Sequence, residues 1–415
     1  MRPQLSLQRE NGLAKEVAAL SGQNPYACYQ CGKCTAGCPF SFGPQQVVRH
    51  LQLGQAAAAL ELETTWGCAG CYTCMAACPK GVDPVRIIRA LRTVDKSHGK
   101  SLQSRLFAYN HRLAPLGSKF APFSNLLLRL PGANLAAHYL LGIHKARSLP
   151  RFERRNFPSW FRGHTPLGDG HRGPVLLFHD TFMDYNVPQT GIAATELLEK
   201  AGFQVELTDT VCCGRPMISK GFMSEAAVQA KTNVARLYER ARQGVFIVGC
   251  EPSCLLTLRD EYPELVQDPE LKKQARVVAK HALLIDEFLA MLNANEELEL
   301  TFNQTQNGGK QVLFHGHCHQ KALADPAKSL ELLRLAGYQA EMANAVCCGM
   351  AGAFGYEKKH YEASMAAFNR DLFPALRAQP EAEVVVMGIS CRQQIEHFAG
   401  RNPRHLAQAL RDAVE

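Results

Sequence analysis

The feature that most constrains this chain of 415 residues is a cysteine pattern that occurs twice near its start. Residues 28–39 read CYQCGKCTAGCP and residues 68–79 read CAGCYTCMAACP. Each run has three cysteines in C-x2-C-x2-C spacing, a fourth cysteine after three more residues, and a proline behind it. Three thiolates two residues apart lie on one tight loop and can face one metal centre, while the fourth reaches away from it. The pattern therefore predicts metal ligation that couples the two runs.

The two runs resemble those of bacterial ferredoxins with two [4Fe–4S] clusters, in which the fourth cysteine of one run binds the cluster of the other. Zinc sites usually join two C-x2-C pairs with four ligands in all, which fits this pattern poorly. We therefore predict two [4Fe–4S] clusters with crossed ligation. The predicted ligands are Cys28, Cys31, Cys34 and Cys78 for the first cluster, and Cys68, Cys71, Cys74 and Cys38 for the second.

The composition is typical of a globular protein in a reducing compartment. It is 46% hydrophobic and 20% charged, and its length suggests two or three domains. All 16 cysteines fall inside the motifs described here, whereas disulfide scaffolds are short and rich in loops. The first residues carry charge and no apolar core of a signal peptide, and no run of about 18 apolar residues occurs. We therefore expect a cytoplasmic protein.

The middle of the chain, residues 98–172, is irregular and basic. Between Arg86 and Arg172 there are 16 Lys and Arg residues against three acids, which exceeds the net charge of +8 of the whole chain. Scattered Pro and Gly predict several short helices. One hypothesis is that this segment lies on an anionic membrane surface, at the inner face of the membrane; the other is a linker that packs on a partner subunit or on the cluster domain. No recognised nucleic-acid fold accompanies the charge, so we do not expect nucleic-acid binding.

From residue 173 onward, short apolar runs alternate with helical patterns, and then the whole block recurs. LLEKAGFQVELTDTVCCG, which ends at Gly214, returns as LLRLAGYQAEMANAVCCG, which ends at Gly349, at an offset of 135 residues. Alternating strands and helices predict βαβ units on a parallel sheet. The fold class we predict is α+β overall, with a mostly helical ferredoxin-like domain followed by two repeated α/β domains. The predicted boundaries are 1–97 for the ferredoxin-like domain, 98–172 for the connector, and 173–292 and 311–415 for the α/β domains, with a polar surface loop near 293–311.

Each α/β repeat supplies four cysteines from three loops, at the strand ends where open α/β sheets place their ligands. Adjacent cysteines make strained disulfides, so metal ligation is the better interpretation. The predicted ligands are Cys212, Cys213, Cys250 and Cys254 in the first repeat, and Cys318, Cys347, Cys348 and Cys391 in the second.

This doubled Cys-Cys-Gly pattern resembles the CCG domains of the heterodisulfide reductase B subunit family, in which five cysteines per domain hold a noncubane [4Fe–4S] cluster. Each repeat here lacks one of the five. The first reads FHDTFMDY without a cysteine after the first strand, and the second has Gly388 where a cysteine would stand. Four thiolates suffice for a cubane cluster or for zinc, so three alternatives remain open at each site: a noncubane cluster, a cubane cluster and zinc. His179, His317 and His319 are candidates for the missing ligand, or for residues that orient one.

The order of the motifs resembles the C subunit of anaerobic glycerol-3-phosphate dehydrogenase, the iron–sulfur subunit of glycolate oxidase, and fused heterodisulfide reductase C–B proteins. No nucleotide-binding fingerprint is present, and clusters alone carry single electrons. The resemblance implies an electron-transfer subunit that accepts electrons from a flavoprotein dehydrogenase for a small hydroxy acid or glycerol 3-phosphate, and passes them to a quinone or another carrier. The alternatives are a heterodisulfide-reductase-like catalytic subunit acting on a disulfide or thiol, and a docking platform whose C-terminal cysteines bind zinc.

Overall fold

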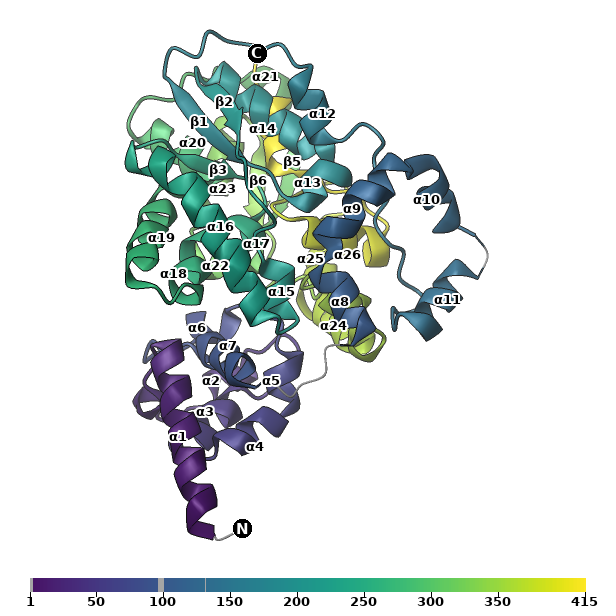
Figure 1. Cartoon of the computed structure of the whole chain (residues 1–415). Coiled ribbons are helices and arrows are strands. Elements are labelled where there is room, and N and C mark those ends of the chain that lie inside the picture. The colour runs from purple at the N-terminus through teal and green to yellow at the C-terminus, as the bar shows by residue number, and fades with distance from the viewer. Residues whose placement is uncertain (1–2, 96–100, 131) are drawn as a thin grey trace.

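The computed structural model describes residues 3–95, 101–130 and 132–415, which form an N-terminal helical domain, a helical connector and two α/β domains (Figure 1). The predicted boundary between residues 97 and 98 lies outside the described residues. The helices of the N-terminal domain are α1 (Pro3–Ser21), α2 (Lys33–Ala36), α3 (Pro44–Gln52), α4 (Ala56–Glu61), α5 (Glu63–Gly67), α6 (Thr73–Ala76) and α7 (Pro84–Val94), with a 3₁₀ turn at Pro25–Ala27.

Local sequence explains where these helices begin. Pro44 and Pro84 are the first residues of α3 and α7, a position where the missing N–H costs nothing. Asp83 caps α7, because its carboxylate accepts hydrogen bonds from the backbone N–H groups of Val85 at 2.8 Å and Arg86 at 3.2 Å. The inner faces of the helices then form one apolar cluster, whose fully buried members include Val17, Val47, Ile87 and Leu91.

The connector consists of short helices, as predicted, and Figure 1 shows two of them, α10 and α11, projecting from the rest of the molecule. Pro115 lies inside one connector helix, and Phe120 separates that helix from the next. In the described parts of the chain, no helix combines the length and the apolar character needed to cross a membrane. The connector helices are α8 (Leu102–Ala108), α9 (Asn110–Lys119), α10 (Ala121–Leu127), α11 (Ala133–Leu140) and α12 (Phe157–Arg162).

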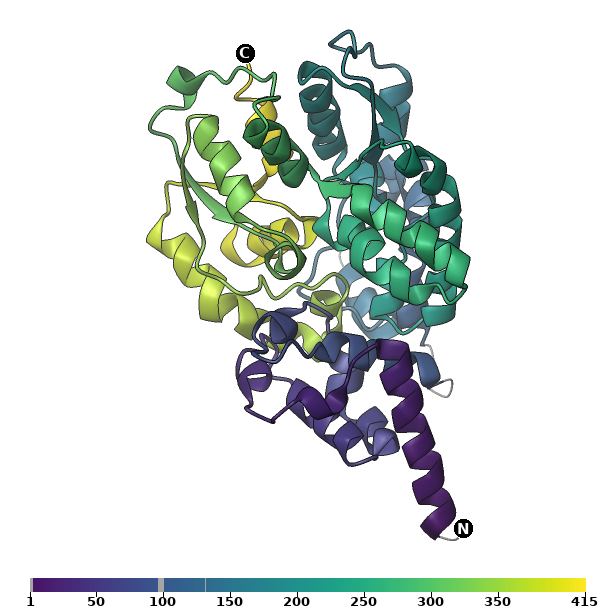
Figure 2. The same ribbon diagram turned by 90° about the vertical axis from the view of Figure 1, so that its left-hand side faces the viewer.

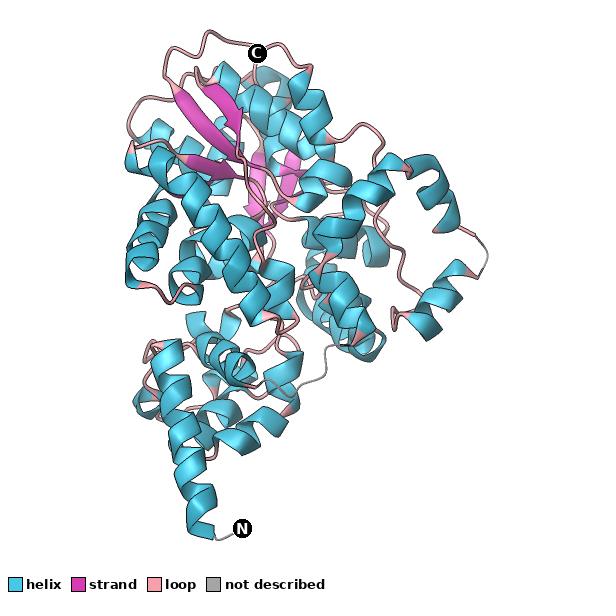
Figure 3. Cartoon of the chain, viewed as in Figure 1, coloured by secondary structure: helices cyan, strands magenta, loops and turns pink. Residues whose placement is uncertain are grey.

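Two four-stranded parallel sheets confirm the predicted α/β repeats, which stand side by side above the N-terminal domain (Figures 2 and 3). The strand orders are β2-β1-β3-β4 and β6-β5-β7-β8, so the repeated sequence gives one repeated topology. The first sheet contains β1 (Pro174–Phe178), β2 (Gln204–Leu207), β3 (Ile247–Gly249) and β4 (Ala282–Leu284). The second contains β5 (Gln311–His315), β6 (Gln339–Met342), β7 (Glu383–Val386) and β8 (Arg404–His405).

Helices cover both faces of each sheet, as parallel sheets require. In the first domain they are α13 (Thr181–Tyr185), α14 (Pro188–Lys200), α15 (Arg215–Ser219), α16 (Met223–Arg242), α17 (Pro252–Leu256), α18 (Tyr262–Leu265), α19 (Pro269–His281) and α20 (Ile285–Ala294), with a π-helical turn at Thr257–Glu261. In the second they are α21 (Gln304–Asn307), α22 (Cys318–Leu323), α23 (Ala327–Leu335), α24 (Tyr361–Ala367), α25 (Phe373–Ala378), α26 (Ile389–Ala399) and α27 (Leu406–Arg411), with 3₁₀ turns at Phe354–Tyr356 and Lys358–His360 and a π-helical turn at Phe368–Leu372.

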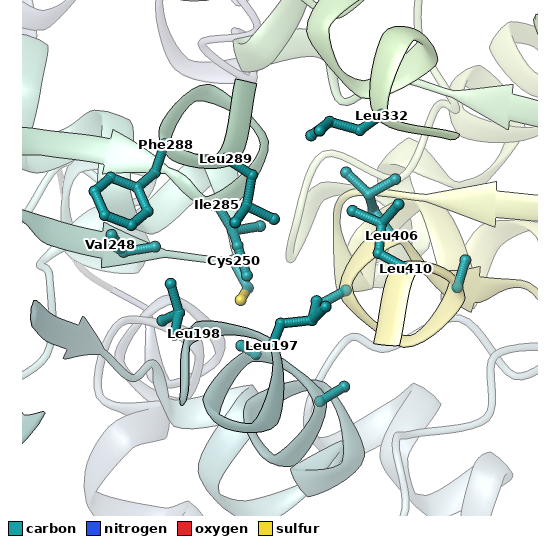
Figure 4. Packing of buried hydrophobic residues seen from close by; sticks show 14 of the residues in the cluster. Leu197, Leu198, Val248, Cys250, Ile285, Phe288, Leu289, Leu332, Leu406 and Leu410 are labelled. Atoms are coloured by element: carbon teal, nitrogen blue, oxygen red, sulfur yellow. The ribbon is translucent and has the colours of Figure 1, made fainter. Parts of the chain in front are cut away.

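One apolar core joins the two α/β domains. Helix α20 of the first domain packs on α23 of the second, and α27 of the second packs on α14 of the first. Figure 4 shows Leu197 and Leu198 of the first domain facing Leu406 and Leu410 of the second, and all four side chains are completely or almost completely buried. The two halves are therefore held together by a shared interior as well as by the chain.

Candidate iron–sulfur sites

Each cysteine run of the N-terminal domain forms a loop that turns into one short helix. The residue before each helix has a positive φ, 79° at Gly32 before α2 and 62° at Tyr72 before α6. A tyrosine in this conformation is strained. Tyr72 is held there because its ring is buried and its hydroxyl lies 2.9 Å from carboxylate oxygens of both Asp260 and Glu261 in the first α/β domain.

The crossed ligation predicted for the two clusters fits the placement of the fourth cysteines. Burial raises the pKa of Cys38, and the nearby Cys68 thiol adds to the rise. At the other loop, the pKa of Tyr29 is raised first by a hydrogen bond with Cys31 and then also by the proximity of Cys78. Each fourth cysteine thus lies beside the opposite run. The ligand assignment itself remains a prediction.

In the first α/β domain, three of the four predicted ligands converge. The sulfur atoms of Cys213 and Cys254 are 3.1 Å apart, and the Cys212 thiol is hydrogen-bonded to that of Cys213. Cys250 lies elsewhere, with its sulfur in the shared core (Figure 4), where burial raises its pKa and the charge of Asp180 adds to the effect. Cys250 is the predicted ligand that the structure sets apart from the others.

In the second α/β domain, all four predicted ligands form one continuous group. The thiol of Cys347 is hydrogen-bonded to those of Cys318 and Cys348, and the thiol of Cys348 to that of Cys391. A histidine that the sequence analysis did not name, His315, joins this group: one ring nitrogen and the sulfur atoms of Cys348 and Cys391 all lie within 4.8 Å of one another. The repeat of LLFH at 176–179 as VLFH at 312–315 was the signal that could have singled it out.

The glycine of each Cys-Cys-Gly motif has a structural reason. Gly214 and Gly349 both adopt φ of 85°, a left-handed conformation that other residues resist. At Gly349 a Cβ atom would also lie 2.3 Å from the backbone oxygen of Ser364. The two glycines let the chain turn directly after the cysteine pair.

A different residue stands in each half where the cysteine is missing. By the same repeat, Phe182 in the first half occupies the place of Cys318 in the second. In the second half, a Cβ atom at Gly388 would lie 2.7 Å from Cδ2 of His317. His317 is fixed there because its Nδ1 accepts a hydrogen bond from the backbone N–H of His319 at the start of α22.

The three histidines named from the sequence all have other partners. His179 places Nδ1 2.8 Å from a carboxylate oxygen of Asp184 and Nε2 3.1 Å from the backbone oxygen of Thr208. Nε2 of His319 lies 2.8 Å from the backbone oxygen of Gly70, and His317 caps α22 as described. These contacts favour roles in positioning loops over metal ligation.

The second cysteine run of the N-terminal domain contacts both α/β domains, the first where Tyr72 meets Glu261 and the second where Gly70 meets His319. Burial raises the pKa of Cys71 to about 12, and the thiol of Cys318 in the second α/β domain adds to the rise. Arg215 of the first α/β domain donates a hydrogen bond to the backbone oxygen of Ala69 at 3.3 Å. A cavity of about 230 Å³, which we call the junction cavity, is lined by Cys71, Cys254 and Cys318, one cysteine from each of three predicted sites.

The donor sets fit iron–sulfur clusters. Thiolates are soft ligands that select iron–sulfur clusters, zinc or copper(I). Burial raises the pKa of Cys74 and that of Cys71, so these thiols stay protonated unless a bound metal supplies positive charge. Backbone N–H groups also point at sulfur, with Gly70 donating to Cys68 at 3.4 Å and Gly349 donating to Cys347 at 3.3 Å. The buried thiols thus occur in groups that favour metal-bound thiolates.

Comparisons with known families agree with this interpretation. Residues 27–82 match the 4Fe-4S dicluster domain, and residues 176–259 and 312–396 both match the cysteine-rich domain. The C subunit of the anaerobic glycerol-3-phosphate dehydrogenase of Escherichia coli is 29% identical over 318 residues, which cover 75% of this chain and 78% of that protein.

Two further relatives each cover a smaller share of this chain. Lactate utilization protein A of Bacillus velezensis is 26% identical over 223 residues, 52% of this chain and 87% of that protein. D-2-hydroxyglutarate dehydrogenase of Escherichia coli is 29% identical over 243 residues, which are 58% of this chain and only 23% of that longer protein. These relatives do not favour the predicted alternative of a heterodisulfide-reductase-like enzyme. This chain contains a 4Fe-4S dicluster domain followed by two cysteine-rich domains. It is therefore a homologue of the C subunit of anaerobic glycerol-3-phosphate dehydrogenase and an electron-transfer iron–sulfur subunit.

Proposed function

We propose that this subunit accepts electrons from a flavoprotein dehydrogenase and passes them to a quinone at a membrane surface. The observation that carries the proposal is the junction cavity, because thiols of three predicted sites line it: Cys71, Cys254 and Cys318. Bound iron–sulfur clusters exchange one electron at a time, which a relay between a flavin and a quinone needs. The residues of this chain bring the ligand loops of the three sites to one place.

The surroundings of the thiols also determine how readily the sites take up electrons. Hydrogen bonds to sulfur and exclusion of water are the protein's means of setting a cluster's potential. Gly70 and Gln30 donate such hydrogen bonds in the dicluster domain, and Gly349 does so in the second cysteine-rich domain. The predicted ligands of the second cysteine-rich domain are more buried than the cysteines of the first run in the dicluster domain, where Cys31 is exposed.

The substrate of the partner is proposed from the relatives. Their names refer to glycerol 3-phosphate, lactate and D-2-hydroxyglutarate, which share a hydroxyl group on a small anionic molecule. Oxidation of such a group releases two electrons and requires a flavin or a nicotinamide cofactor. The sequence carries no nucleotide-binding fingerprint, so we assign the flavin to the partner.

The connector supports the location at a membrane. Five large apolar side chains of α9, α10 and the residue between them are 55–75% exposed, and we call them the connector stripe: Leu116, Phe120, Phe123, Leu126 and Leu127. No Asp or Glu occurs between Asp95 and Glu153, whereas Arg112, Lys119 and Arg129 flank the stripe. Apolar side chains bordered by cations bind anionic lipid interfaces. Phe107, Leu128 and Phe152 of the connector also line the junction cavity, so the same segment borders both the solvent and the cavity.

Quinone reduction by the anaerobically purified chain tests the proposed relay. With reduced methyl viologen as donor and menadione as acceptor, the wild-type chain should raise the rate of quinone reduction above that of the reagents alone, and Cys71→Ser should return it to that background. Tyr26→Phe serves as the control, because Tyr26 is exposed and is not a predicted ligand. A chain that carries its clusters but does not reduce menadione would refute the assignment of the quinone.

Flotation with vesicles tests the location. The wild-type chain should float with phosphatidylglycerol vesicles at low salt, whereas the double variant F123E/L127E should remain at the bottom of the gradient. Val228→Glu is a matched control, since Val228 is 62% exposed but lies on α16 of the first cysteine-rich domain. Equal flotation of the wild type and both variants would exclude the connector stripe as the binding surface.

A further inference from the structure

His315 is a buried histidine whose side chain makes no hydrogen bond to any residue that the structure describes. It ends β5, and it is 1% exposed. Neither ring nitrogen has a hydrogen-bond partner among the residues that the structure describes. Leaving polar atoms unpaired in a protein interior is costly, and buried polar groups almost always have partners. A histidine kept in this position therefore calls for a partner that the protein chain alone does not supply.

The nearest groups that could act with His315 are two thiols. One of its ring nitrogens and the sulfur atoms of Cys348 and Cys391 all lie within 4.8 Å of one another. A tetrahedral metal with bonds of about 2.0–2.3 Å separates its ligand atoms by about 3.5–3.8 Å, so small adjustments bring these three atoms to a single metal. Burial holds the pKa of His315 well below its usual value, and the neutral imidazole is the form that binds metals.

The equivalent histidine of the first half gives an internal comparison. His179 ends the matching LLFH segment, but its two nitrogens already face Asp184 and Thr208 at 2.8 and 3.1 Å. The same sequence position is thus satisfied by the protein in one half and left open beside two thiols in the other. Both halves have four cysteines, but they lack different ones, and the second site is without the cysteine that would stand at Gly388.

We propose that His315 is a ligand of the metal centre at the second cysteine-rich site, together with Cys348 and Cys391. Cys318 and Cys347 complete the site from the side that faces Cys71 of the dicluster domain. Imidazole and thiolate together suit an iron atom of a cluster or a zinc ion. The inference rests on the proposed function only in requiring that this site binds a metal.

The test compares the anaerobically purified full chain with His315→Leu, His315→Cys and the matched control His179→Leu. His315→Leu should lose the metal of the second site, whereas His315→Cys should keep it, because a thiolate can take the place of the imidazole. Loss of one [4Fe–4S] cluster would lower the iron content by about four per chain from about 16. Loss of zinc would instead remove about one zinc per chain and leave the iron unchanged.

Two further measurements distinguish ligation from a packing role. Pulsed electron paramagnetic resonance of the reduced wild type should show coupling of an iron spin to a histidine nitrogen if the metal is iron, and zinc-edge absorption should show one nitrogen ligand if it is zinc. Either signal should vanish in both His315 variants and persist in His179→Leu. After removal of metal, His315→Leu should melt at a higher temperature than the metal-free wild type, since leucine replaces an unpaired imidazole.

Three outcomes would overturn the inference. Unchanged metal content in His315→Leu, or a nitrogen signal that survives in it, would exclude His315 as a ligand while leaving the second site intact. A wild-type chain with about eight irons and no zinc would show that the cysteine-rich domains bind no metal, and it would refute both this inference and the proposed relay through them.

Discussion

The two cysteine-rich domains share one topology, yet they hold the dicluster domain by different physical means. The first domain uses charge. Arg89 of α7 lies 2.7 Å from Glu261 and 2.5 Å from Glu264, and Arg86 lies 2.8 Å from Asp260. The π-helical turn at Thr257–Glu261 presents two of these carboxylates. Such turns often occur at functional positions, and this one aims Asp260 and Glu261 at a neighbouring domain.

The second domain uses aromatic rings instead. Phe40 of the dicluster domain packs against Phe354, with ring centroids 4.3 Å apart, and Phe42 approaches the same ring at 6.3 Å. Cys347 is buried in the cluster that these rings form, and Cys38 packs against it. The apolar contact therefore brings a predicted ligand of the second dicluster site close to a predicted ligand of the second cysteine-rich site.

The comparison suggests how a duplicated domain can diverge in role. Ion pairs fix orientation through directional contacts, and the first domain supplies them from Asp260, Glu261 and Glu264. An apolar aromatic contact allows close approach of two sites, and the second domain supplies it beside Cys347. We infer that the first domain mainly orients the dicluster domain, while the second mainly receives its electrons.

Removing the cysteine pair of one domain at a time should have the largest effect on activity, and the two variants should differ in that effect. Both C212S/C213S and C347S/C348S should lose the metal of their own site, which is about four irons if that site holds a [4Fe–4S] cluster. Only C347S/C348S should reduce quinone reduction by viologen to background, because Cys347 and its neighbour Cys318 are the predicted ligands beside Cys71. Equal losses of activity in the two variants would refute the division of roles.

The ion pairs of the first domain give the next largest effect. Burial alone would raise the pKa of Glu261, but Arg215 and Arg89 outweigh burial and hold it well below its usual range. Glu261→Gln would leave these guanidinium groups in the interior without their shared counter-charge, which should lower the free energy of unfolding by about 3–5 kcal/mol. Urea unfolding under anaerobic conditions measures the change.

Glu239→Gln is the matched control for that substitution. Glu239 pairs with Arg242 at 2.8 Å, but both side chains are exposed, and exposed pairs contribute about 0–1 kcal/mol. Similar losses of stability in the two variants would mean that the interface with the dicluster domain does not depend on its buried charges.

Much of this arrangement could be predicted from sequence, because its signals are local or repeated. The spacing of Cys28 to Cys78 indicated a dicluster domain, and the recurring Cys-Cys-Gly block indicated two sheets of the same order. The contacts between domains could not be predicted. Neither Phe354 nor Glu261 has a sequence pattern that indicates its partner, which is 314 residues away for Phe354 (Phe40) and 189 residues away for Glu261 (Tyr72), since such pairing depends on how folded domains pack.

The candidate sites show the same limit. Fifteen of the predicted ligands lie in groups with other cysteines, whereas Cys250 shares its loop with Cys254 in the sequence and yet points into the shared core. Its loop has one more residue between the cysteines than the C-x2-C spacing of the related families. His315 was missed for the opposite reason: its importance lies in lacking a hydrogen-bond partner, which only the surroundings of the folded chain reveal.

The aromatic contact of the second domain should give a smaller and more local effect. Phe354→Leu keeps an apolar side chain but loses the ring pair with Phe40, which should cost about 0.5–1.5 kcal/mol. The fluorescence of Trp66, recorded in a W160F background, reports unfolding of the dicluster domain, because the chain has only these two tryptophans. The loss in free energy of unfolding should be larger when it is measured by this fluorescence than when it is measured by the circular dichroism of the whole chain. A loss that is equal by both probes would contradict a local role at the interface.

The smallest expected effect concerns the shared core and depends on pH. Asp286 is the second residue of α20, where the equivalent helix α27 has Ala407. Its carboxylate accepts hydrogen bonds from Gln320 and Ser329 of the second domain, both at 2.6 Å. Burial raises the pKa of Asp286 to about 6, although the hydrogen bond from Ser329 opposes the shift. The first half thus places a titratable group in a core position that the second half fills with a methyl group.

The sign of the effect follows from the raised pKa. An unfolded Asp has a pKa of about 3.9, so the folded chain binds this proton more tightly, and the stabilisation from proton binding is lost as pH rises from about 4 through about 6. Between pH 5.5 and 8 the loss should be about 1 kcal/mol. Asp286→Asn does not titrate, so the stability difference between it and the wild type should shift by that amount in favour of the variant at pH 8. In Ser329→Ala, this stabilisation should be lost at a higher pH than in the wild type, because the variant lacks a hydrogen bond that favours the charged carboxylate. If the free energy of unfolding changed with pH in parallel for the wild type and Asp286→Asn, the titration of Asp286 would not affect stability, and this difference between the two halves would be refuted.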